Sequence, residues 1–177
     1  MWLKFVSEHC TQAEYILKTD DDVFVNIFAV VDFLNRITQQ NVRPRKSIMC
    51  FVWKGMDVIR DPKDKWYVNK EEYVPDIFPP YCSGAAYIIT RDLIRPMYEQ
   101  SFKIKFIWVD DFFITGALIE ALQAEHFSIN FLYAFEGIRT KEQLRHSSEY
   151  TFFAHSNVNL RLAMWKDVVK RQGIEIN

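Results

Sequence analysis

Glycine and cysteine are both scarce in this chain of 177 residues. The five glycines are scattered and form no Gly-rich phosphate loop, which weakens the case for a phosphoryl-transfer enzyme. The three cysteines, Cys10, Cys50 and Cys82, include no Cys-x-x-Cys pair, so a zinc site is not expected. Their odd number leaves one thiol unpaired or paired outside the chain, and neither the pairing nor the redox compartment follows from the sequence.

Long apolar runs and an excess of charge of either sign are also missing. No run approaches the ~18 apolar residues of a membrane-spanning helix. The net charge of -1 indicates no surface for nucleic acid or for an anionic membrane. Hydrophobic residues nevertheless make up 49% of the chain, which excludes a disordered protein. The length favours a single domain over residues 1–177.

Short apolar runs alternate with segments of helical periodicity, and this alternation predicts an α/β fold. We expect strands at residues 13–18, 47–53, 85–89, 129–135 and 151–154. We expect helices at residues 2–10, 27–37, 92–100, 112–124, 141–146 and 159–171. Residues 57–80 are charged and aromatic with four prolines, and a segment of this length with little regular structure is usually functional.

Local features refine these elements. Asn26 and Thr90 precede predicted helices and can cap them, whereas Pro96 should start, kink or end its helix. The helix after Asn26 should pack one face on the sheet through Ile27, Val30, Val31, Leu34 and Ile37. The last helix should pack through Leu162, Trp165, Val168 and Val169.

Asp20, Asp21 and Asp22 directly follow an apolar run. In a strand, Asp20 and Asp22 would point to one face and Asp21 to the other. Like charges this close resist ionising together unless a cation joins them, and carboxylate oxygens suit Mg, Mn or Ca. A divalent-metal site that grips substrate phosphates and an acidic, solvated strand end both fit the pattern. An EF-hand does not, because Val25 stands where its loop needs a glycine.

A second acidic pair, Asp110 and Asp111, stands just before a predicted helix. Carboxylates there favour the helix dipole, which alone explains many such pairs. The alternative is a general base at the mouth of a cleft, which must reach the hydroxyl that it deprotonates.

The segment from Pro79 to Tyr87 combines two prolines with small residues. The prolines force an extended or turn geometry, and Gly84 with its neighbouring alanines allows a close approach of the backbone to another group. The segment is either a tight entry into a strand or the floor of a substrate pocket.

His155 follows the apolar run 152–154. A histidine in this setting is more often a packed core residue than a ligand, although imidazole can bind Mn-type ions beside carboxylates. We interpret His9, His126 and His146 as surface residues.

Three blocks, in this order and at this spacing, resemble the β1,3-galactosyltransferase family, which includes β1,3-N-acetylglucosaminyltransferases and, more distantly, fringe-type enzymes. The blocks are residues 15–26 (YILKTDDDVFVN), 81–87 (YCSGAAY) and 110–116 (DDFFITG). The resemblance extends over nearly the whole chain. It implies a Rossmann-like fold of GT-A type, a metal at the carboxyl edge of the sheet, and an inverting hexosyltransferase that takes galactose or N-acetylglucosamine from a UDP-sugar.

The resemblance also implies roles for individual residues. Asp111 matches the general base that deprotonates the 3-hydroxyl of an acceptor glycan. Asp20, Asp21 and Asp22 match the cofactor-binding block, with Asp20, Asp22 and His155 on Mn2+ or Mg2+. The substrate-binding residues are expected to be Trp53, Lys54, Tyr81, Ser83, Gly84, Ala85 and Asp110. The acceptor would be an oligosaccharide, a glycoprotein or a glycolipid.

The sequence departs from the family pattern in places. Asp110 stands where Glu is usual, Phe112 replaces a common Val, and Ala85 and Ala86 stand where glycine is more common. The family's membrane anchor, stem and first βα units, which hold the uracil, should precede Met1, so we expect an amino-terminally truncated catalytic region. A location on the lumenal side of the Golgi membrane follows from the family alone.

Two alternatives remain open. One is a catalytically inactive, truncated homologue that acts as a binding or partner protein. The other is a metal-dependent phosphoryl-transfer enzyme, because acidic clusters at strand ends serve there too.

Overall fold

The computed structural model describes residues 2–40, 44–135, 151–154 and 157–174. These residues divide into two units. The first unit takes residues up to Lys18 and Pro44–Ser128, and the second takes Thr19–Arg43 and residues from Ile129 onward. The expectation of one domain over residues 1–177 stays a prediction.

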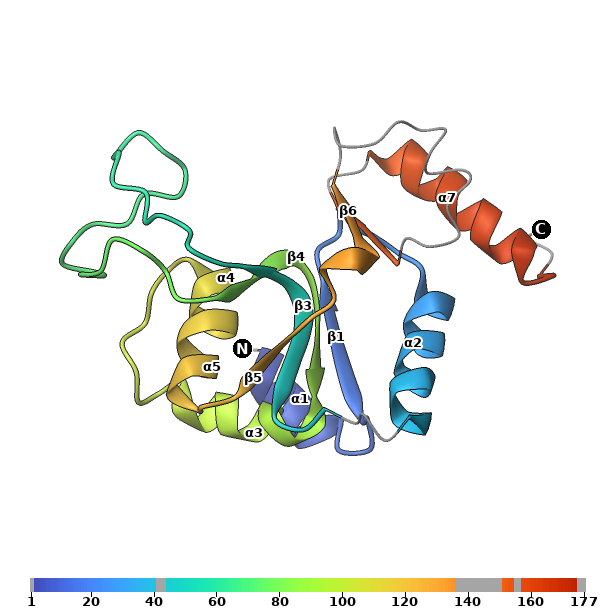
Figure 1. The fold of residues 1–177 in the computed structure, drawn as a ribbon, viewed down its shortest axis with the longest axis horizontal. Helices are drawn as coiled ribbons and strands as arrows, with labels where there is room; N and C mark the ends of the chain where they lie inside the picture. Colours follow the sequence, from blue (N-terminus) through green and yellow to red (C-terminus); the bar gives the residue numbers. More distant parts are fainter. Residues whose placement is uncertain (1, 41–43, 136–150, 155–156, 175–177) are drawn as a thin grey trace. The chain divides into compact units, whose positions relative to one another are not determined.

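The first unit is built on a four-stranded sheet (Figure 1), in the order β1-β4-β3-β5. Its strands are β1 (Tyr15–Thr19), β3 (Ser47–Trp53), β4 (Tyr81–Thr90) and β5 (Glu125–Ser128). β3 pairs with β4 antiparallel and with β5 parallel. The prediction of a mixed α/β fold is therefore confirmed. The strand expected at residues 85–89 begins earlier, at Tyr81, and β5 was not expected because its four residues show no clear apolar alternation.

Helices pack on this sheet and close the core of the first unit. α1 (Trp2–His9) and α3 (Arg91–Gln100) contact each other and lie side by side in Figure 1. A third helical segment runs through α4 (Asp110–Phe112), the π-helical η1 (Phe113–Ala117) and α5 (Leu118–Ala121). The main core cluster joins these helices to alternate residues of β3, and its members include Leu3, Ile48, Cys50, Val52, Leu93, Met97 and Leu118.

One expectation about α3 is narrowed and another is corrected. Pro96 lies inside the helix and neither starts nor ends it, so the kink is the predicted outcome that stays a prediction. Burial of Ile94 and Met97 on either side offsets the hydrogen bond that the proline removes. Thr90 stands at the N-cap position without capping. Its hydroxyl instead accepts from the Ser47 N–H (3.1 Å) and donates to the Ser47 carbonyl (3.2 Å), which ties β4 to β3.

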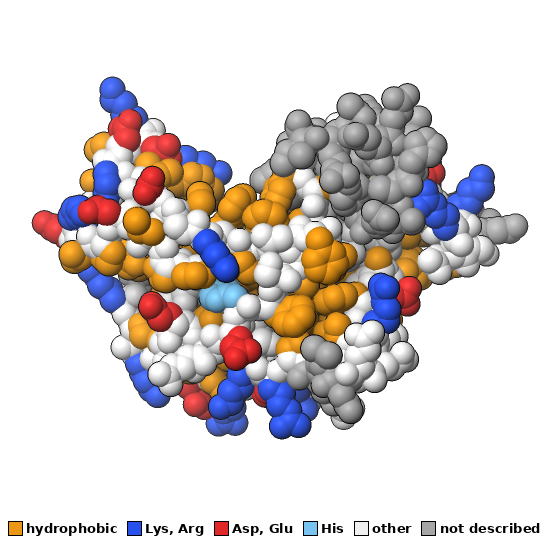
Figure 2. All heavy atoms as spheres, in the orientation of Figure 1, with side chains coloured by type: hydrophobic (Ala, Val, Ile, Leu, Met, Phe, Trp, Pro, Cys, Tyr) orange, Lys and Arg blue, Asp and Glu red, His pale blue; other side chains and the backbone are white. Residues whose placement is uncertain are grey.

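The segment between β3 and β4 has little regular structure, as expected, apart from an isolated bridge between Asp57 and Ile77. It is nevertheless well organised around Arg60. The guanidinium donates to the carbonyls of Val68 (2.7 Å), Tyr73 (2.8 Å) and Pro75 (2.5 Å). Apolar side chains also stand among charged ones on the outer surface of this segment (Figure 2, upper left).

A disulfide joins Cys50 in β3 to Cys82 in β4, with the two Cα atoms 5.7 Å apart. The thiol of Cys10 is free. The sequence left the cysteine pairing open, and the structure shows one disulfide within the sheet and one free thiol.

The second unit contains a three-stranded sheet in the order β2-β7-β6. The strands are β2 (Phe24–Val25), β7 (Phe152–Ala154) and β6 (Tyr133–Phe135), with β2 and β7 antiparallel and β6 and β7 parallel. The strand expected at 129–135 is only partly present, because the 3-10 helix η2 (Asn130–Leu132) takes its middle. The helix expected at 141–146 lies outside the described residues.

The helices of the second unit bury fewer of their apolar residues than the helical spacing of those residues predicted. α2 (Ile27–Gln39) is capped by Asn26, whose side chain accepts from the Ala29 N–H, as expected. Val30 and Ile37 are buried, but Ile27 and Val31 are 41% and 48% exposed, so the expected apolar face is only partly covered.

α7 (Val158–Arg171) shows the same difference. Val169 is buried and Val168 packs against the small cluster of Phe24 and Ala134. Leu162 is 54% exposed, contrary to expectation, and Trp165 is partly exposed while its ring stacks on Phe28. Among the described residues, no helix has both the length and the apolar character needed to span a membrane.

Candidate active site

The central feature of the first unit is a wide bulge in β4. The ladder between β3 and β4 pairs Cys50 with Tyr87 and Val52 with Cys82. Between these pairs β3 has Phe51 alone, whereas β4 has the residues 83–86. The surplus residues must leave the regular ladder and bend the strand. The predicted close approach of the backbone at Gly84 therefore occurs within the strand, and not at its entry.

Gly84 meets the carboxylate of Asp111 across this bulge. A Cβ atom built on Gly84 would overlap both carboxylate oxygens and Cγ of Asp111. The carboxylate thus occupies the space that any other residue at position 84 would fill with its side chain. The glycine of the second sequence block and the aspartate of the third are brought together, which the sequence could not show.

Tyr81 is the third member of this cluster. Its ring stands edge-on to those of Phe78 (5.8 Å) and Phe112 (6.1 Å). Burial raises the pKa of the Tyr81 phenol, and the nearby charge of Asp111 raises it further. The phenol therefore keeps its proton at neutral pH and can donate a hydrogen bond to a ligand.

Asp110 and Asp111 differ in their surroundings although they are neighbours. Both lie in the first turn of α4, where carboxylates favour the helix dipole. Asp110 is exposed, whereas Asp111 is half-buried against Gly84. Helix-start chemistry explains both residues equally, but the contact with Gly84 belongs to Asp111 alone.

The helix that carries Asp111 is held to the sheet at Thr115, a fully buried residue of the π-helical segment. The Thr115 hydroxyl accepts from the Cys82 N–H (2.8 Å) and donates to the Asp111 carbonyl (2.5 Å). The Thr115 carbonyl accepts from Nε2 of His126 in β5 (2.6 Å). The expectation that His126 is a surface residue is therefore wrong, because its ring is half-buried and bonded.

Lys18 contacts the bulge from β1, the strand that lies on the opposite side of β4 from β3. Its Nζ donates to the Gly84 carbonyl (2.7 Å) and lies 5.4 Å from the centre of the Tyr87 ring. The bulge is thus fixed at Gly84 by a charge-assisted hydrogen bond, which is stronger than a neutral one.

Trp53 and Lys54 lie at the same end of the sheet as Tyr81. Trp53 stands opposite Tyr81 in the β3–β4 ladder, and its ring is 4.6 Å from that of Phe51. Lys54 follows β3 and is exposed, whereas Ser83 and Ala85 in the bulge are buried. The predicted substrate residues Trp53, Tyr81 and Gly84 are therefore grouped with the predicted base, Asp111, in one region of the first unit.

The acidic residues Asp20, Asp21 and Asp22 belong to the second unit, where all three are exposed. They form a turn after β1, closed by the Val23 N–H on the Asp20 carbonyl (3.4 Å), so the strand alternation that we expected does not apply. The Arg161 guanidinium donates to the Asp22 carbonyl (3.1 Å). Within the described ranges no group of three or more His, Cys, Asp or Glu side chains could hold a metal, and His155 lies outside those ranges.

Comparison with known proteins connects these features. A family model described as Galactosyltransferase matches residues 1–130. Beta-1,3-galactosyltransferase 5 of Pan troglodytes is 34% identical over 122 residues, which cover 69% of this chain and 39% of that protein. Beta-1,3-galactosyltransferase 1 of Mus musculus is 28% identical over 114 residues, which cover 64% of this chain and 34% of that protein.

The chain belongs to the galactosyltransferase family.

The galactosyltransferase match covers the acidic turn, the bulge and Asp111 but not His155. The mixed sheet with its packed helices is consistent with a GT-A-like domain of this family. The aligned segment spans about 39% of the length of the galactosyltransferase 5 relatives.

Three residues around the galactosyltransferase candidate site were missed: Lys18, Thr115 and His126. Lys18 and Thr115 lie inside the blocks that carry the family resemblance, so their position beside Asp20 and Asp111 was a usable signal. His126 gave no such signal, because its role depends on a parallel pairing between β3 and β5 that no local pattern indicates.

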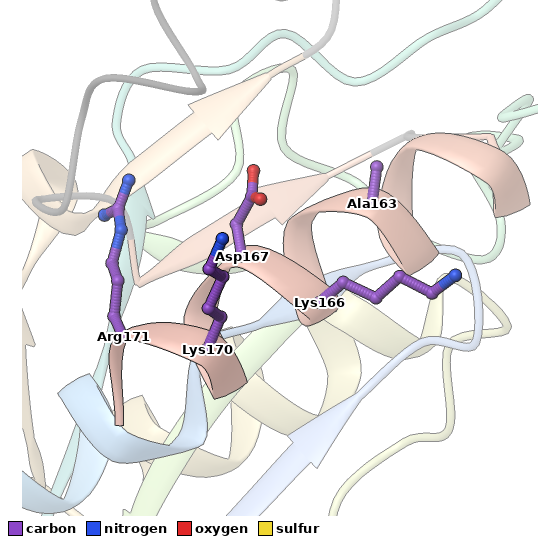
Figure 3. Close-up of a pocket in the computed structure, with 5 residues that line it drawn as sticks. All are labelled: Ala163, Lys166, Asp167, Lys170 and Arg171. Carbon is purple, nitrogen blue, oxygen red and sulfur yellow. The ribbon is translucent and has the colours of Figure 1, made fainter. Parts of the chain in front are cut away.

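Pockets also occur in the described part of the chain away from the residues of the candidate site. One, of about 520 Å3, lies along α7, with Lys170, Arg171 and Asp167 projecting to one side (Figure 3). Another, of about 190 Å3, lies between α1 and α3 and includes Cys10. The candidate site is recognised by the side-chain geometry around Gly84 and Asp111.

Proposed function

We propose that this protein is an inverting hexosyltransferase. It moves galactose or N-acetylglucosamine from a UDP-sugar to the 3-hydroxyl of an acceptor glycan. The observation that carries the proposal is the carboxylate of Asp111 seated on Gly84 beside Tyr81, in a chain of the galactosyltransferase family.

Asp111 is the general base of the proposed reaction. Its carboxylate takes the proton from the acceptor hydroxyl as that oxygen attacks C1 of the donor sugar and the bond from C1 to the UDP oxygen breaks. A single displacement of this kind needs one base and inverts the anomeric centre. The absence of a side chain on Gly84 leaves room for the carboxylate. Tyr81, which keeps its proton, supplies a hydrogen-bond donor beside it.

Asp20, Asp21 and Asp22 are the residues that we propose to bind a divalent ion, Mn2+ or Mg2+, with His155 as a further ligand. The fit rests on their chemistry, since three exposed carboxylates on one turn offer the oxygen ligands that hard cations prefer. When bound, the ion would supply positive charge to the diphosphate of the leaving UDP.

The proposed partners and location follow from the same function. Trp53 and Lys54, with Ser83, Ala85 and Asp110, are proposed to contact the donor and acceptor sugars, and the acceptor is an oligosaccharide, glycoprotein or glycolipid. The disulfide between Cys50 and Cys82 suits an oxidising compartment. That agrees with a site on the lumenal side of the Golgi membrane.

The test is sugar transfer by the purified protein from UDP-galactose and UDP-N-acetylglucosamine, with and without Mn2+. We expect Asp111→Asn to lower kcat by about 10²- to 10⁴-fold, the usual contribution of a general base. Glu120→Gln is the matched control, because it removes an exposed carboxylate on α5 of the same helical segment. Turnover retained in Asp111→Asn would remove the base assignment.

The alternative function is non-catalytic. In that case the chain is an inactive homologue that binds a sugar nucleotide or a partner. Calorimetry with UDP and Mn2+ separates the outcomes when combined with the transfer assay. Binding with transfer supports the enzyme, whereas binding without transfer supports the inactive homologue.

A further inference from the structure

We propose that Thr115 is the positioning residue for the carboxylate of Asp111, a role that rests on the proposed function of Asp111 as the base. The hydrogen bonds of Thr115 described above do not involve the carboxylate oxygens of Asp111. Thr115 acts through the backbone, by fixing the helical turn of Asp111 on β4 and β5.

The first step concerns the backbone around Asp111. The helical segment changes from α to π geometry at Phe113 and returns to α geometry at Leu118. Single π turns weaken the regular ladder and occur often at functional sites. The hydroxyl of Thr115 compensates by donating to the carbonyl of Asp111 at 2.5 Å, which fixes the residue four positions earlier.

The second step concerns the sheet. The same hydroxyl oxygen accepts from the Cys82 N–H, two residues before Gly84. One buried oxygen therefore connects the backbone of Asp111 with the strand that carries the bulge. These two hydrogen bonds of the Thr115 hydroxyl set the position of the carboxylate relative to Gly84. One bond fixes the backbone from which the Asp111 side chain projects, and the other fixes the strand that contains Gly84.

The third step concerns the opposite side of Thr115. Its carbonyl accepts from Nε2 of His126, so β5 restrains the turn as well as β4. One hydrogen bond within the turn and two to neighbouring strands leave the turn little freedom to shift. A displacement of about 1 Å in a reacting group can cost about 10²-fold in rate, so this restraint matters for catalysis.

The experiment compares Thr115→Val, Thr115→Ser and Thr90→Val. Valine has the shape of threonine without the hydroxyl, and serine restores the hydroxyl. Thr90→Val is the matched control, because Thr90 is also buried and makes the same pair of bonds, one accepted and one donated, to Ser47. The two valine variants each lose one accepted and one donated hydrogen bond, but only Thr115 is linked to Asp111.

We expect Thr115→Val to lower kcat by about 10- to 100-fold with the KM for the UDP-sugar unchanged, and Thr115→Ser to restore most of it. Thr90→Val should lower the melting temperature similarly and leave kcat unchanged. Equal losses of kcat in Thr115→Val and Thr90→Val would mean that Thr115 serves stability alone and would overturn the proposal.

A crystal structure of Thr115→Val gives a second readout that does not depend on activity. We expect the Asp111 carboxylate to leave its place on Gly84, and an unmoved carboxylate would also overturn the proposal. Failure of the proposed function is distinct from these outcomes, because it appears as absent transfer by the wild type or as full turnover in Asp111→Asn, whatever the Thr115 variants do.

Discussion

Gly84 shows how one missing side chain can define a site. Its backbone does not adopt the left-handed conformation seen at Gly55 and Gly173, so it is not needed for backbone freedom. It is needed because the carboxylate of Asp111 occupies the position of a Cβ atom. Position 84 therefore requires glycine because the Asp111 carboxylate leaves no room for a side chain there.

Gly84→Ala is expected to lower kcat by about 10²-fold or more, because the added methyl group must push the Asp111 carboxylate away from its place. Steady-state transfer kinetics measure the effect, and thermal melting shows how much of the fold is kept. Wild-type kcat in a folded Gly84→Ala protein would mean that the carboxylate works from another position.

At the scale of elements, Arg60 connects distant parts of the segment between β3 and β4. Arg60 donates to three backbone carbonyls, and its side chain is only 25% exposed. Because charged donors to backbone carbonyls are stronger than neutral ones, one arginine can organise a long segment without regular structure.

Arg60→Ala is expected to lower the free energy of unfolding by about 2 kcal/mol and to expose residues 61–76 to proteolysis. Limited proteolysis followed by mass spectrometry locates the cleavage. Lys70→Ala is the control, because its ion pair with Asp76 is exposed and should contribute little to stability. Equal protection of wild type and Arg60→Ala would show that the apolar cluster under this segment holds it without the arginine.

The disulfide between β3 and β4 lies next to the bulge, since Cys82 immediately precedes Ser83. Replacing Cys50 and Cys82 together by alanine is expected to lower the free energy of unfolding by about 2–4 kcal/mol. Denaturant titration measures the loss, and Cys10→Ala serves as the control for removing a free thiol. Two or more reactive thiols in the native, non-reduced protein would contradict the pairing.

At the scale of the whole molecule, His126 couples stability to pH. Burial lowers the pKa of the His126 imidazole below its ordinary value of 6.5. The hydrogen bond to the Thr115 carbonyl opposes this effect in part, and the charge of Lys54 adds a smaller lowering of the pKa. The unfolded chain therefore binds a proton more readily than the folded chain. Stability is fully present above about pH 6.5 and is lost as the pH falls through that value toward the lower pKa of the folded state.

We expect the melting temperature of the wild type to fall between about pH 7 and pH 5.5, before most carboxylates titrate. His126→Gln, which keeps a donor but does not titrate, should show a smaller fall over the same range. Parallel slopes for the two proteins would show that other groups control this pH range.

The sequence predicted much of the fold but less of the site's internal geometry. Strands with continuous apolar runs, such as Ser47–Trp53, were predicted at their observed bounds because burial on both faces leaves a clear pattern. β5 and the π turn were not, because one is half-exposed and short and the other depends on contacts with β4 and β5. The partly uncovered faces of α2 and α7 show that helical spacing alone does not tell how much of a face is packed.

The candidate site was predicted as a set of residues and not as an arrangement. The blocks containing Gly84 and Asp111 were identified, but their contact results from a register shift between β3 and β4 that only the ladder reveals. Lys18 and Thr115 were overlooked although both lie inside the blocks that carry the family resemblance, because the backbone groups that they bind are brought near only by the fold.

The place of β1 in the sheet affects how the protein can be synthesised. Among the described strands β1 pairs with β4 alone. During synthesis, Lys18 can form its hydrogen bond only after Gly84 has been added, 66 residues later in the chain. At about 5–20 residues per second, a ribosome takes roughly 3–13 seconds to supply that partner. During this time β1 is a nascent strand with open edges, the kind of segment that aggregates or recruits chaperones.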